Sequence, residues 1–380
     1  MFPLTLIVYA LAALVAGSLV FSLLMIVAAW RYASVKTPPA PQAWPPISLL
    51  TPLAGKDLGL EDNLRTSFAQ EYPDFELVFA VRQETDSAVP VARQLMAAFP
   101  NVPSQLIIAG EPQCPNAKVH SLKAMTRAAK HDLLVMNDSD IRSAPDALRR
   151  IAAEFADPKL ALATCPSTAV AGPGLAARLE ALLMNTQFMG GVLVARMLEG
   201  VRFALGPSAV VRRHALEAIG GWDALDEYLA EDFMLGKLIA ERGDGVILSS
   251  VRVQHHIGNA PWDATMNHRL RWCRSTRRSR PHGYIGEVFT NPLPLAVALV
   301  CAAPYLWTAL ALTAAVRYAA CWAVAKWALN DPLALRDFVW IPVQDMIAFG
   351  VWVAGFFGNT VSWRGRTYEL STDGKFRPVA

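Results

Sequence analysis

Acidic residues that could bind a metal follow a predicted strand in the middle of the chain. Asp138 and Asp140 lie two positions apart, directly after the apolar run Leu133–Met136. Because ligands of α/β proteins bind at the carboxyl ends of strands, the two carboxylates could converge on one hard divalent cation. Mg²⁺ or Mn²⁺ held there would bridge the oxygens of a diphosphate. Asp-Ser-Asp is also good turn sequence, so the motif alone leaves a solvated turn as the alternative.

A second acidic pair, Glu231-Asp232, stands at the predicted start of a helix. Acids at this position are ordinarily explained by the helix dipole. A carboxylate here could also be the general base that deprotonates an acceptor hydroxyl in line with a sugar C1, given a basic partner that tunes its pKa. We assign this role to Asp232 first and to Glu231 second.

Three further positions could recognise a nucleotide. Asp86 lies just past the second predicted strand, where it could accept hydrogen bonds from a uracil edge or a ribose, and Glu84 is a neighbouring candidate. Lys118 could reach the base or a phosphate as a point charge. A surface lysine before a helix would have the same local sequence.

Two histidines follow the predicted strand 247–253. Neutral imidazole is a common metal ligand, so His255 could be a third ligand beside Asp138 and Asp140. The alternative is that His255 and His256 are solvated loop residues.

A basic and aromatic motif, His268-x-x-Arg271-Trp272, opens a stretch with six arginines between 269 and 280. At helical spacing these three side chains share roughly one face. The planar fork of Arg271 suits a diphosphate, while Trp272 could pack against the sugar or the acceptor channel. Part of the arginine stretch is expected to bind anionic lipid at a membrane surface.

Short apolar runs alternate with helical patterns from residue 47 onward, and these elements would position the side chains above. We predict strands at 47–53, 75–81, 106–109 and 133–136, and helices at 58–70, 89–99 and 121–129. This alternation is typical of an α/β domain with a largely parallel sheet. The sequence has neither a Gly-x-Gly-x-x-Gly after a strand nor a Walker loop, which gives little support to a dinucleotide fold.

Apolar segments flank this domain. Residues 1–30 carry no charge and are long enough to cross a bilayer, and they lack the basic start of a cleaved signal peptide. Arg31 and Lys36 follow, so the positive-inside rule predicts that the domain faces the cytoplasm. Further apolar runs lie at 288–316, 318–330 and 338–360. They predict two or three membrane segments, one of which could be re-entrant or interfacial.

The chain therefore divides into five parts. They are a transmembrane anchor (1–30), a linker (31–46), a catalytic domain with interfacial helices (47–287), membrane segments (288–360) and a tail (361–380). Within the domain, residues 175–199 form either a core-facing helix or an amphipathic helix in the membrane surface.

The composition agrees with a mixed architecture. Hydrophobic residues make up 53% and charged residues 18%, which is too apolar for an average soluble enzyme. The net charge of +3 is too small to indicate binding to nucleic acid. Five scattered cysteines without a Cys-x-x-Cys spacing favour reduced thiols.

In order and spacing, Asp86, Asp138, Glu231-Asp232 and the motif at 268–272 resemble the ceramide glucosyltransferase family of membrane glycosyltransferases. The resemblance covers about residues 1–290 and extends to the segments Leu49–Asp57, Glu71–Glu76, Asn137–Arg142 and Tyr228–Met234. The chain also resembles a bacterial sister group associated with hopanoid lipids. A ceramide-type lipid and a hopanoid polyol therefore both stay open as acceptors.

The resemblance implies a Rossmann-like GT-A domain between transmembrane helices in a bacterial-type inner membrane. It also implies a UDP-sugar donor, a divalent cation (Mg²⁺ or Mn²⁺) and the inverting transfer of one hexose or N-acetylhexosamine to a lipid hydroxyl in the phospholipid bilayer. The sugar and the oligomeric state stay open.

Carried over by position, Asp86 resembles the nucleotide-binding aspartate, Asp138 the metal-site aspartate and Asp232 the base. Thr51 and Pro52 fall in a matching segment and are expected near the nucleotide sugar. His268 departs from the family pattern, because Gln or Arg usually holds its place.

Three other functions remain as alternatives. A processive polysaccharide synthase uses similar motifs but needs more membrane spans than this chain offers. A polyprenyl-phosphate glycosyltransferase would use the arginine stretch to bind an acceptor phosphate. A catalytically inactive lipid-binding scaffold is the alternative that is not an enzyme.

Overall fold

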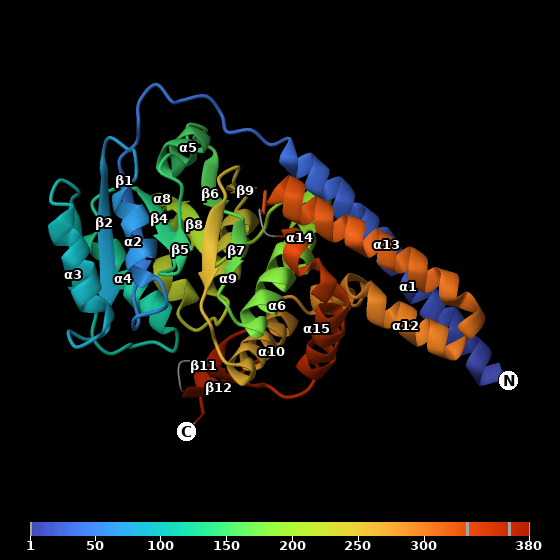
Figure 1. The fold of residues 1–380 in the computed structure, drawn as a ribbon. Coiled ribbons are helices and arrows are strands. Elements are labelled where there is room, and N and C mark those ends of the chain that lie inside the picture. Colours follow the sequence, from blue (N-terminus) through green and yellow to red (C-terminus); the bar gives the residue numbers. More distant parts are fainter. Residues whose placement is uncertain (1, 332–333, 364–365, 380) are drawn as a thin grey trace.

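Two parts of different character make up the molecule, an α/β domain and a group of apolar helices (Figure 1). The computed structural model describes residues 2–331, 334–363 and 366–379. Residues 35–46 connect the two parts without helix or strand. The first helix continues to Ala33, so irregular backbone begins a few residues later than the predicted start of the linker at residue 31.

A seven-stranded sheet forms the centre of the α/β domain, in the order β3-β2-β1-β4-β8-β6-β9. The strands are β1 (Ile47–Pro52), β2 (Phe75–Val81), β3 (Ser104–Ile108), β4 (Leu133–Asn137), β6 (Leu160–Thr164), β8 (Ser208–Arg212) and β9 (Gly245–Leu248). The first four in this order run parallel, and β8 runs antiparallel to both of its neighbours. The predicted α/β class is confirmed, with a mixed sheet.

Helices cover both faces of this sheet, which is why its inner strands are apolar along their whole length. One core contains α2 (Leu60–Phe68), α3 (Ala88–Ala98) and α5 (Ala147–Glu154). The other contains α4 (Ala117–Ala128), α8 (Arg213–Ala218), the short turn η2 (Gly221–Leu225) and α9 (Glu231–Glu241). Because β1, β2 and β4 are parallel, their carboxyl ends meet at one edge.

A small second sheet, β5-β10-β7, lies at that edge. It consists of β5 (Ile141–Arg142), β10 (Val253–Ile257) and β7 (Ser167–Ala171). The predicted strand at 247–253 is wrong in its bounds, because β9 ends at Leu248 and β10 begins at Val253. His255 and His256 are thus strand residues and not loop residues. Pairing with β5 and β7, which are distant in sequence, decides this.

Residues 175–199 form one helical segment with a wide turn in its middle. It is divided into α6 (Leu175–Leu183), the π-helical turn η1 (Met184–Phe188) and α7 (Met189–Glu199). The Asn185 side chain accepts a hydrogen bond from Ala169 N at 2.7 Å and donates one to Ala169 O at 2.9 Å. Asn185 thereby completes the edge of β7, and α7 packs against the first helix of the chain.

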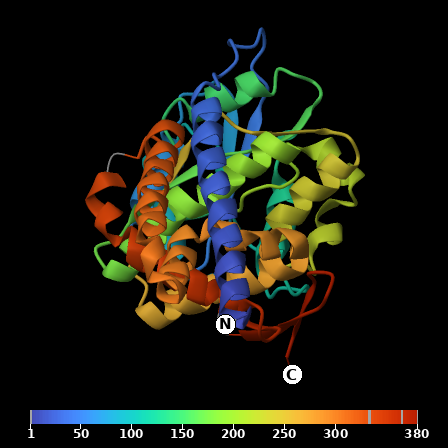
Figure 2. The same ribbon diagram turned by 90° about the vertical axis from the view of Figure 1, so that its right-hand side faces the viewer.

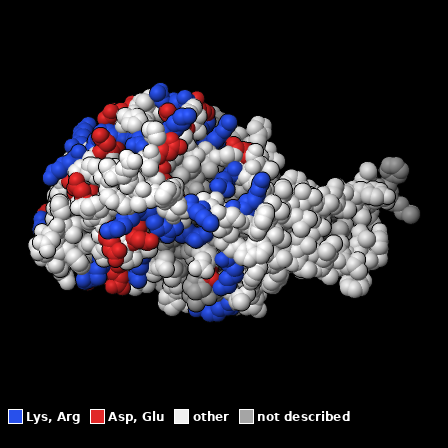
Figure 3. Space-filling view, turned by 90° about the horizontal axis from the view of Figure 1, so that it is seen from above, with Lys and Arg blue, Asp and Glu red and all other residues white. Residues whose placement is uncertain are grey.

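The apolar helices α1 (Phe2–Ala33), α12 (Pro292–Ala302) and α13 (Trp307–Ala323) lie side by side (Figures 1 and 2). α15 (Ile341–Gly355) packs against α10 (Trp262–Ser279). The short elements of this region are α11 (Pro281–Gly286), η3 (Glu287–Thr290), η4 (Pro304–Leu306), η5 (Val324–Ala328), α14 (Ala334–Asp337) and η6 (Phe338–Trp340). Figure 3 shows this part almost free of charge, with Lys and Arg gathered where it meets the α/β domain.

By length and composition, four helical segments in the described part of the chain could cross a membrane. They are Leu4–Ala33, Leu175–Glu199, Pro304–Ala328 and Leu335–Gly355. A fifth is possible if Pro281–Thr290 and Pro292–Ala302, bent by 63°, count as one broken span. The bent pair fits the expectation that one segment is re-entrant or interfacial.

The end of the chain folds back onto the α/β domain. β11 (Thr360–Trp363), β12 (Arg366–Leu370) and β13 (Phe376–Pro378) form an antiparallel sheet. Phe376 N donates a hydrogen bond to Glu227 O at 2.9 Å. In Figure 1 the C-terminal sheet lies beside the α/β domain, away from the apolar helices α1, α12 and α13.

Candidate active site

Three carboxylates and one lysine meet at the carboxyl edge of the central sheet. Lys118, in the first turn of α4, places Nζ 2.7 Å from Asp138 Oδ1 and 3.5 Å from Glu231 Oε1. Asp138 follows β4 directly, and Glu231 and Asp232 begin α9 as predicted. Elements that are far apart in the sequence thus converge on Lys118.

Asn116 joins two of these elements and was overlooked in the sequence. Its side-chain oxygen accepts hydrogen bonds from the backbone N of Lys118 at 3.0 Å and of Val119 at 3.1 Å, which makes it the N-cap of α4. Its amide donates to Glu231 Oε2 at 3.0 Å and to Tyr228 O at 2.8 Å. The sequence signal for this N-cap role is an asparagine placed immediately before a helix.

The electrostatics of the cluster favour a base that works near neutral pH. Burial and the neighbouring Glu231 carboxylate raise the pKa of Asp232 from 3.8 to about 7, although Lys118 opposes this shift. Burial disfavours the charged lysine, but Asp138 and Glu231 outweigh it, so the pKa of Lys118 is raised. Lys118 is therefore a fixed cation among the acids.

Gly206 brings the backbone close to the same group. A Cβ atom at Gly206 would lie 3.0 Å from Asp232 Oδ2, and Lys118 Nζ donates to Gly206 O at 3.3 Å. A larger residue would push the Asp232 carboxylate from its place. The wall of the site depends on a residue without a side chain.

Asp140 and His255 form a neighbouring pair, with 3.1 Å between Oδ2 and Nε2. Burial raises the pKa of Asp140, but the hydrogen bond and charge of His255 prevail and lower it overall. The other atoms of the pair, Asp140 Oδ1 and His255 Nδ1, are buried without a hydrogen-bond partner among the described residues. These atoms have free capacity for a ligand.

The donor set fits a divalent cation in its chemistry. Among the described residues, no three His, Cys, Asp or Glu side chains already surround one point. However, Asp138 and Asp140 supply hard oxygen atoms, and the free atoms of the Asp140–His255 pair lie beside them. Substrate oxygens or water would have to supply the remaining ligands.

The residues assigned to the nucleotide lie around the ends of β1 and β2. The Asp86 carboxylate accepts hydrogen bonds from Gly55 N at 3.0 Å and Ala88 N at 2.8 Å, which fixes the loop after β1. Thr51 is buried, and its hydroxyl has no hydrogen-bond partner among the described residues; Pro52 ends β1. Glu84 is exposed and pairs with Arg93 at 2.5 Å, away from the others.

The basic and aromatic motif lies on one helix, α10, as its spacing predicts. The rings of His268 and Trp272 meet edge to face with 4.6 Å between centroids. Burial and the nearby Arg271 lower the pKa of His268 to about 3. His268 is therefore neutral at pH 7 and holds no diphosphate by charge.

A buried ion pair fixes α10 against its neighbours. Arg269 Nε donates to Glu180 Oε2 of α6 at 2.5 Å, and Arg269 Nη1 donates to Gln344 Oε1 of α15 at 3.0 Å. The sequence pattern of 175–199 did not single out Glu180. Further along α10, Arg274 and Arg277 donate to backbone carbonyls between 356 and 360. These three arginines of the stretch 269–280 thus make internal contacts.

Comparisons with known proteins identify the family of the chain. The model of glycosyl transferase family 21 matches residues 8–376. Ceramide glucosyltransferase 1 of Caenorhabditis elegans is 26% identical over 88% of this chain and 73% of its own length. Ceramide glucosyltransferase 3 of the same organism is 24% identical over 88% of this chain and 74% of its own.

A solved structure shares the fold. The mannosyltransferase from Pyrobaculum calidifontis, in complex with GDP-Man and Mn²⁺, superposes with a TM-score of 0.55 at 21% identity, over 93% of this chain and 99% of the other. Together with the family match along nearly the whole chain, this places the molecule among GT-A-like hexosyltransferases that are related to ceramide glucosyltransferases. The chain belongs to glycosyl transferase family 21.

Proposed function

We propose that this protein transfers one sugar, glucose or a related hexose or N-acetylhexosamine, from a UDP-sugar to the hydroxyl of a membrane lipid. The acceptor is a ceramide-type lipid or a hopanoid polyol. The observation that carries the proposal is the half-buried Asp232 carboxylate, which lies beside Glu231 and Lys118 and whose pKa is raised to about 7. Relatives named ceramide glucosyltransferases support the lipid acceptor.

Asp232 would act as the general base. It takes the proton of the acceptor hydroxyl while the hydroxyl oxygen forms a bond to the sugar C1 from the side opposite the diphosphate. The bond from C1 to the diphosphate oxygen breaks, and its electron pair leaves with UDP. Configuration at C1 is inverted. Glu231 is held by Asn116 and Lys118, and it would orient the first turn of α9 for this step.

The donor would be held by residues on both sides of the site. Asp138, Asp140 and His255 would bind Mg²⁺ or Mn²⁺. Such a cation would neutralise part of the negative charge on the departing diphosphate. Arg271 would contact the diphosphate from α10 with its planar fork, and Trp272 would pack against the sugar, with neutral His268 beside it. Asp86, Thr51, Pro52, Glu84 and Lys118 are the proposed nucleotide-sugar contacts.

The bilayer would supply the acceptor. The apolar helices α1 and α13 would cross the membrane, and α12 would enter it as part of the bent pair with 281–290. The segment that contains α15 is also long enough to cross, and α15 packs against α10. Arg31 and Lys36 follow α1 and favour a cytoplasmic α/β domain. In this arrangement the motif at 268–272 lies next to the membrane surface, where a lipid hydroxyl can reach Asp232.

Product analysis tests the proposal. Full-length protein in bilayer nanodiscs receives UDP-glucose or UDP-N-acetylglucosamine with Mn²⁺, and either a ceramide or a hopanoid polyol as acceptor lipid. We expect UDP release and a lipid heavier by one sugar, both abolished by a chelator and restored by Mn²⁺ or Mg²⁺. A product series with several sugars, or no UDP release with any lipid, would contradict the proposal.

A further inference from the structure

The last strands of the chain cover the outer side of the loop that leads into Asp232. Residues 226–230 lie between η2 and α9 and have no helix or regular strand of their own. Lys375 pairs with Tyr228 through an isolated antiparallel bridge. Lys375 Nζ also donates to Glu227 Oε2 at 2.6 Å, and this contact lowers the pKa of Glu227. The C-terminal sheet is thus bonded to the loop through backbone and side chain.

An apolar contact strengthens this attachment. Leu229 is 6% exposed because it packs into the core of the C-terminal sheet. That core consists of Val361, Tyr368, Leu370 and Phe376. Burial removes the apolar surface of Leu229 from water, which favours the attachment. The loop thus gives Leu229 to the core of the C-terminal sheet, while Tyr228 packs against the α/β core.

The opposite side of the loop faces the α/β domain. There, Asn116 donates to Tyr228 O at 2.8 Å and to Glu231 Oε2 at 3.0 Å. The loop is therefore held between Asn116, which caps the helix carrying Lys118, and the C-terminal sheet. Lys123 Nζ also pairs with Asp226 Oδ2 at 3.2 Å on the inner side, so release of the sheet would leave the loop held from that side alone.

The same C-terminal segment is also bonded to the helix that carries Arg271 and Trp272. Arg277 donates to Gly358 O at 2.7 Å and to Asn359 Oδ1 at 2.9 Å. Arg274 donates to Thr360 O at 2.6 Å. The described parts of this segment, 358–363 and 366–376, therefore contact both α10 and the loop before Asp232.

We infer that the C-terminal sheet positions the general base relative to the diphosphate motif, with Lys375 and Phe376 as positioning residues. They touch no reacting atom and act through Glu227, Tyr228 and Leu229. The inference rests on the proposed role of Asp232. Misplacement of a reacting group by about 1 Å can cost on the order of 100-fold in rate. Because the C-terminal sheet holds the loop before Asp232 in place, we expect it to affect the turnover number.

Kinetics of full-length variants in nanodiscs test the inference. Lys375→Ala is expected to lower kcat by about three- to tenfold, and Phe376→Ala by up to about 100-fold, with the KM for the UDP-sugar unchanged. Lys375→Arg keeps the charge and is expected to restore kcat. Arg366→Gln, which removes an exposed cation from the same sheet, is the matched control and keeps the wild-type kcat. Equal kcat for Lys375→Ala and wild type would overturn the inference.

Amide hydrogen exchange gives a readout that does not need activity. Lys375→Ala and Phe376→Ala are expected to speed exchange at least tenfold in residues 226–230, while residues 133–137 of β4 stay protected. Faster exchange in β4 as well would show that Phe376→Ala disturbs the whole domain. In that case the exchange rate of residues 226–230 in Lys375→Ala decides whether the inference holds. Unchanged exchange at 226–230 in Lys375→Ala would overturn the inference, even if wild type transferred no sugar and the proposed function itself failed.

Discussion

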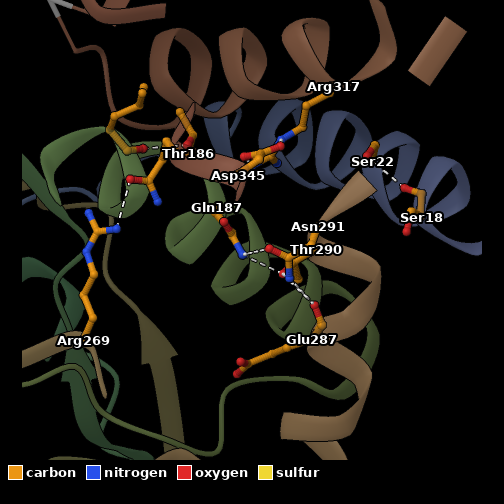
Figure 4. A network of polar contacts seen from close by, with 12 residues as sticks. Ser18, Ser22, Thr186, Gln187, Arg269, Glu287, Thr290, Asn291, Arg317 and Asp345 are labelled. Carbon is orange, nitrogen blue, oxygen red and sulfur yellow. Dashed lines mark hydrogen bonds and ion pairs between the residues drawn. The ribbon is translucent and has the colours of Figure 1, made fainter. Parts of the chain in front are cut away.

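Two charge clusters in this molecule, one fully buried and one half-buried, differ in the balance of their charges. Between the apolar helices α13 and α15, Arg317 and Asp345 are each 1% exposed and make two hydrogen bonds of 2.9 and 2.8 Å (Figure 4). At the edge of the sheet, one cation, Lys118, faces Asp138 and Glu231 with Asp232 beside them. The first cluster has one charge of each sign, and the second has a surplus of carboxylates.

The difference separates a structural pair from a reactive group. A bidentate Arg–Asp pair satisfies its own charges in an apolar surrounding, so it fixes helices and leaves nothing for a substrate. In the Lys118 cluster, one lysine cannot neutralise three acids, so a carboxylate keeps a raised pKa. The surplus of carboxylates around Lys118 makes this cluster a candidate for catalysis.

Removal of the base should have the largest effect. Asp232→Asn keeps the size of the side chain but cannot take a proton, so kcat is expected to fall by about 10²- to 10⁴-fold. The rate of UDP release in lipid nanodiscs measures this. Asp223→Asn, at an acid whose side chain is 81% exposed, is the control and should retain wild-type turnover. Wild-type activity in Asp232→Asn would show that another group is the base.

Breaking the Arg317–Asp345 ion pair should destabilise the fold and leave the sugar-transfer step unchanged. Arg317→Met leaves Asp345 buried without its partner and is expected to cost about 3–5 kcal/mol of folding stability. The double variant Arg317→Met with Asp345→Leu should recover most of that loss. Thermal unfolding in detergent measures both. If the single and double variants were equally unstable, the pair would not act as a unit.

The pH profile should report the unbalanced cluster. Because Asp232 must be ionised to accept a proton, kcat/KM is expected to fall about tenfold per pH unit below about 7 and to level off above it. The folding stability contributed by Asp232 changes with pH in the direction opposite to kcat/KM. Its folded pKa is raised above 3.8, so the stability contributed by this group is present below pH 3.8 and is lost as pH rises through about 7.

Two measurements separate these effects. Asp232→Asn should abolish the activity inflection and flatten the unfolding temperature over the same range. An inflection that stays near pH 7 in the residual activity of Asp232→Asn would assign the titration to another group.

The smallest effect is expected from the wall of the site. In Gly206→Ala, the new Cβ would lie 3.0 Å from Asp232 Oδ2, so the carboxylate must shift by a few tenths of an ångström. We expect a loss of about three- to tenfold in kcat with unchanged thermal stability. Gly191→Ala serves as a control, because a Cβ there meets nothing within 4 Å. A fall in stability without a fall in kcat would show that Gly206 matters for packing only.

Local pattern was enough to predict the elements that carry most candidate residues. Apolar runs bounded by turn residues gave β1, β2 and β4, and helical spacing placed the motif at 268–272 on α10. The acidic pair at 231–232 was placed at a helix start for the same reason. These features depend on neighbours within about one or two helical turns, which the sequence displays directly.

Pairing between distant segments was beyond local pattern. His255 was expected after a strand, but it lies within β10 because β5 and β7 supply its backbone partners, and this brings it 3.1 Å from Asp140. The number of membrane-spanning segments could not be predicted from local sequence either, because the bend of 63° between 281–290 and 292–302 is seen only in the packed structure.

By itself, the sequence determined the α/β class, the apolar flanks and the candidate acids, since residue type and spacing encode them locally. Only the tertiary structure decided that Lys118 sits among the acids and that Glu180 pairs with Arg269. It also placed the C-terminal sheet on the loop before Asp232. These contacts join residues that are tens to hundreds of positions apart, and they form because the packed core brings their backbones together.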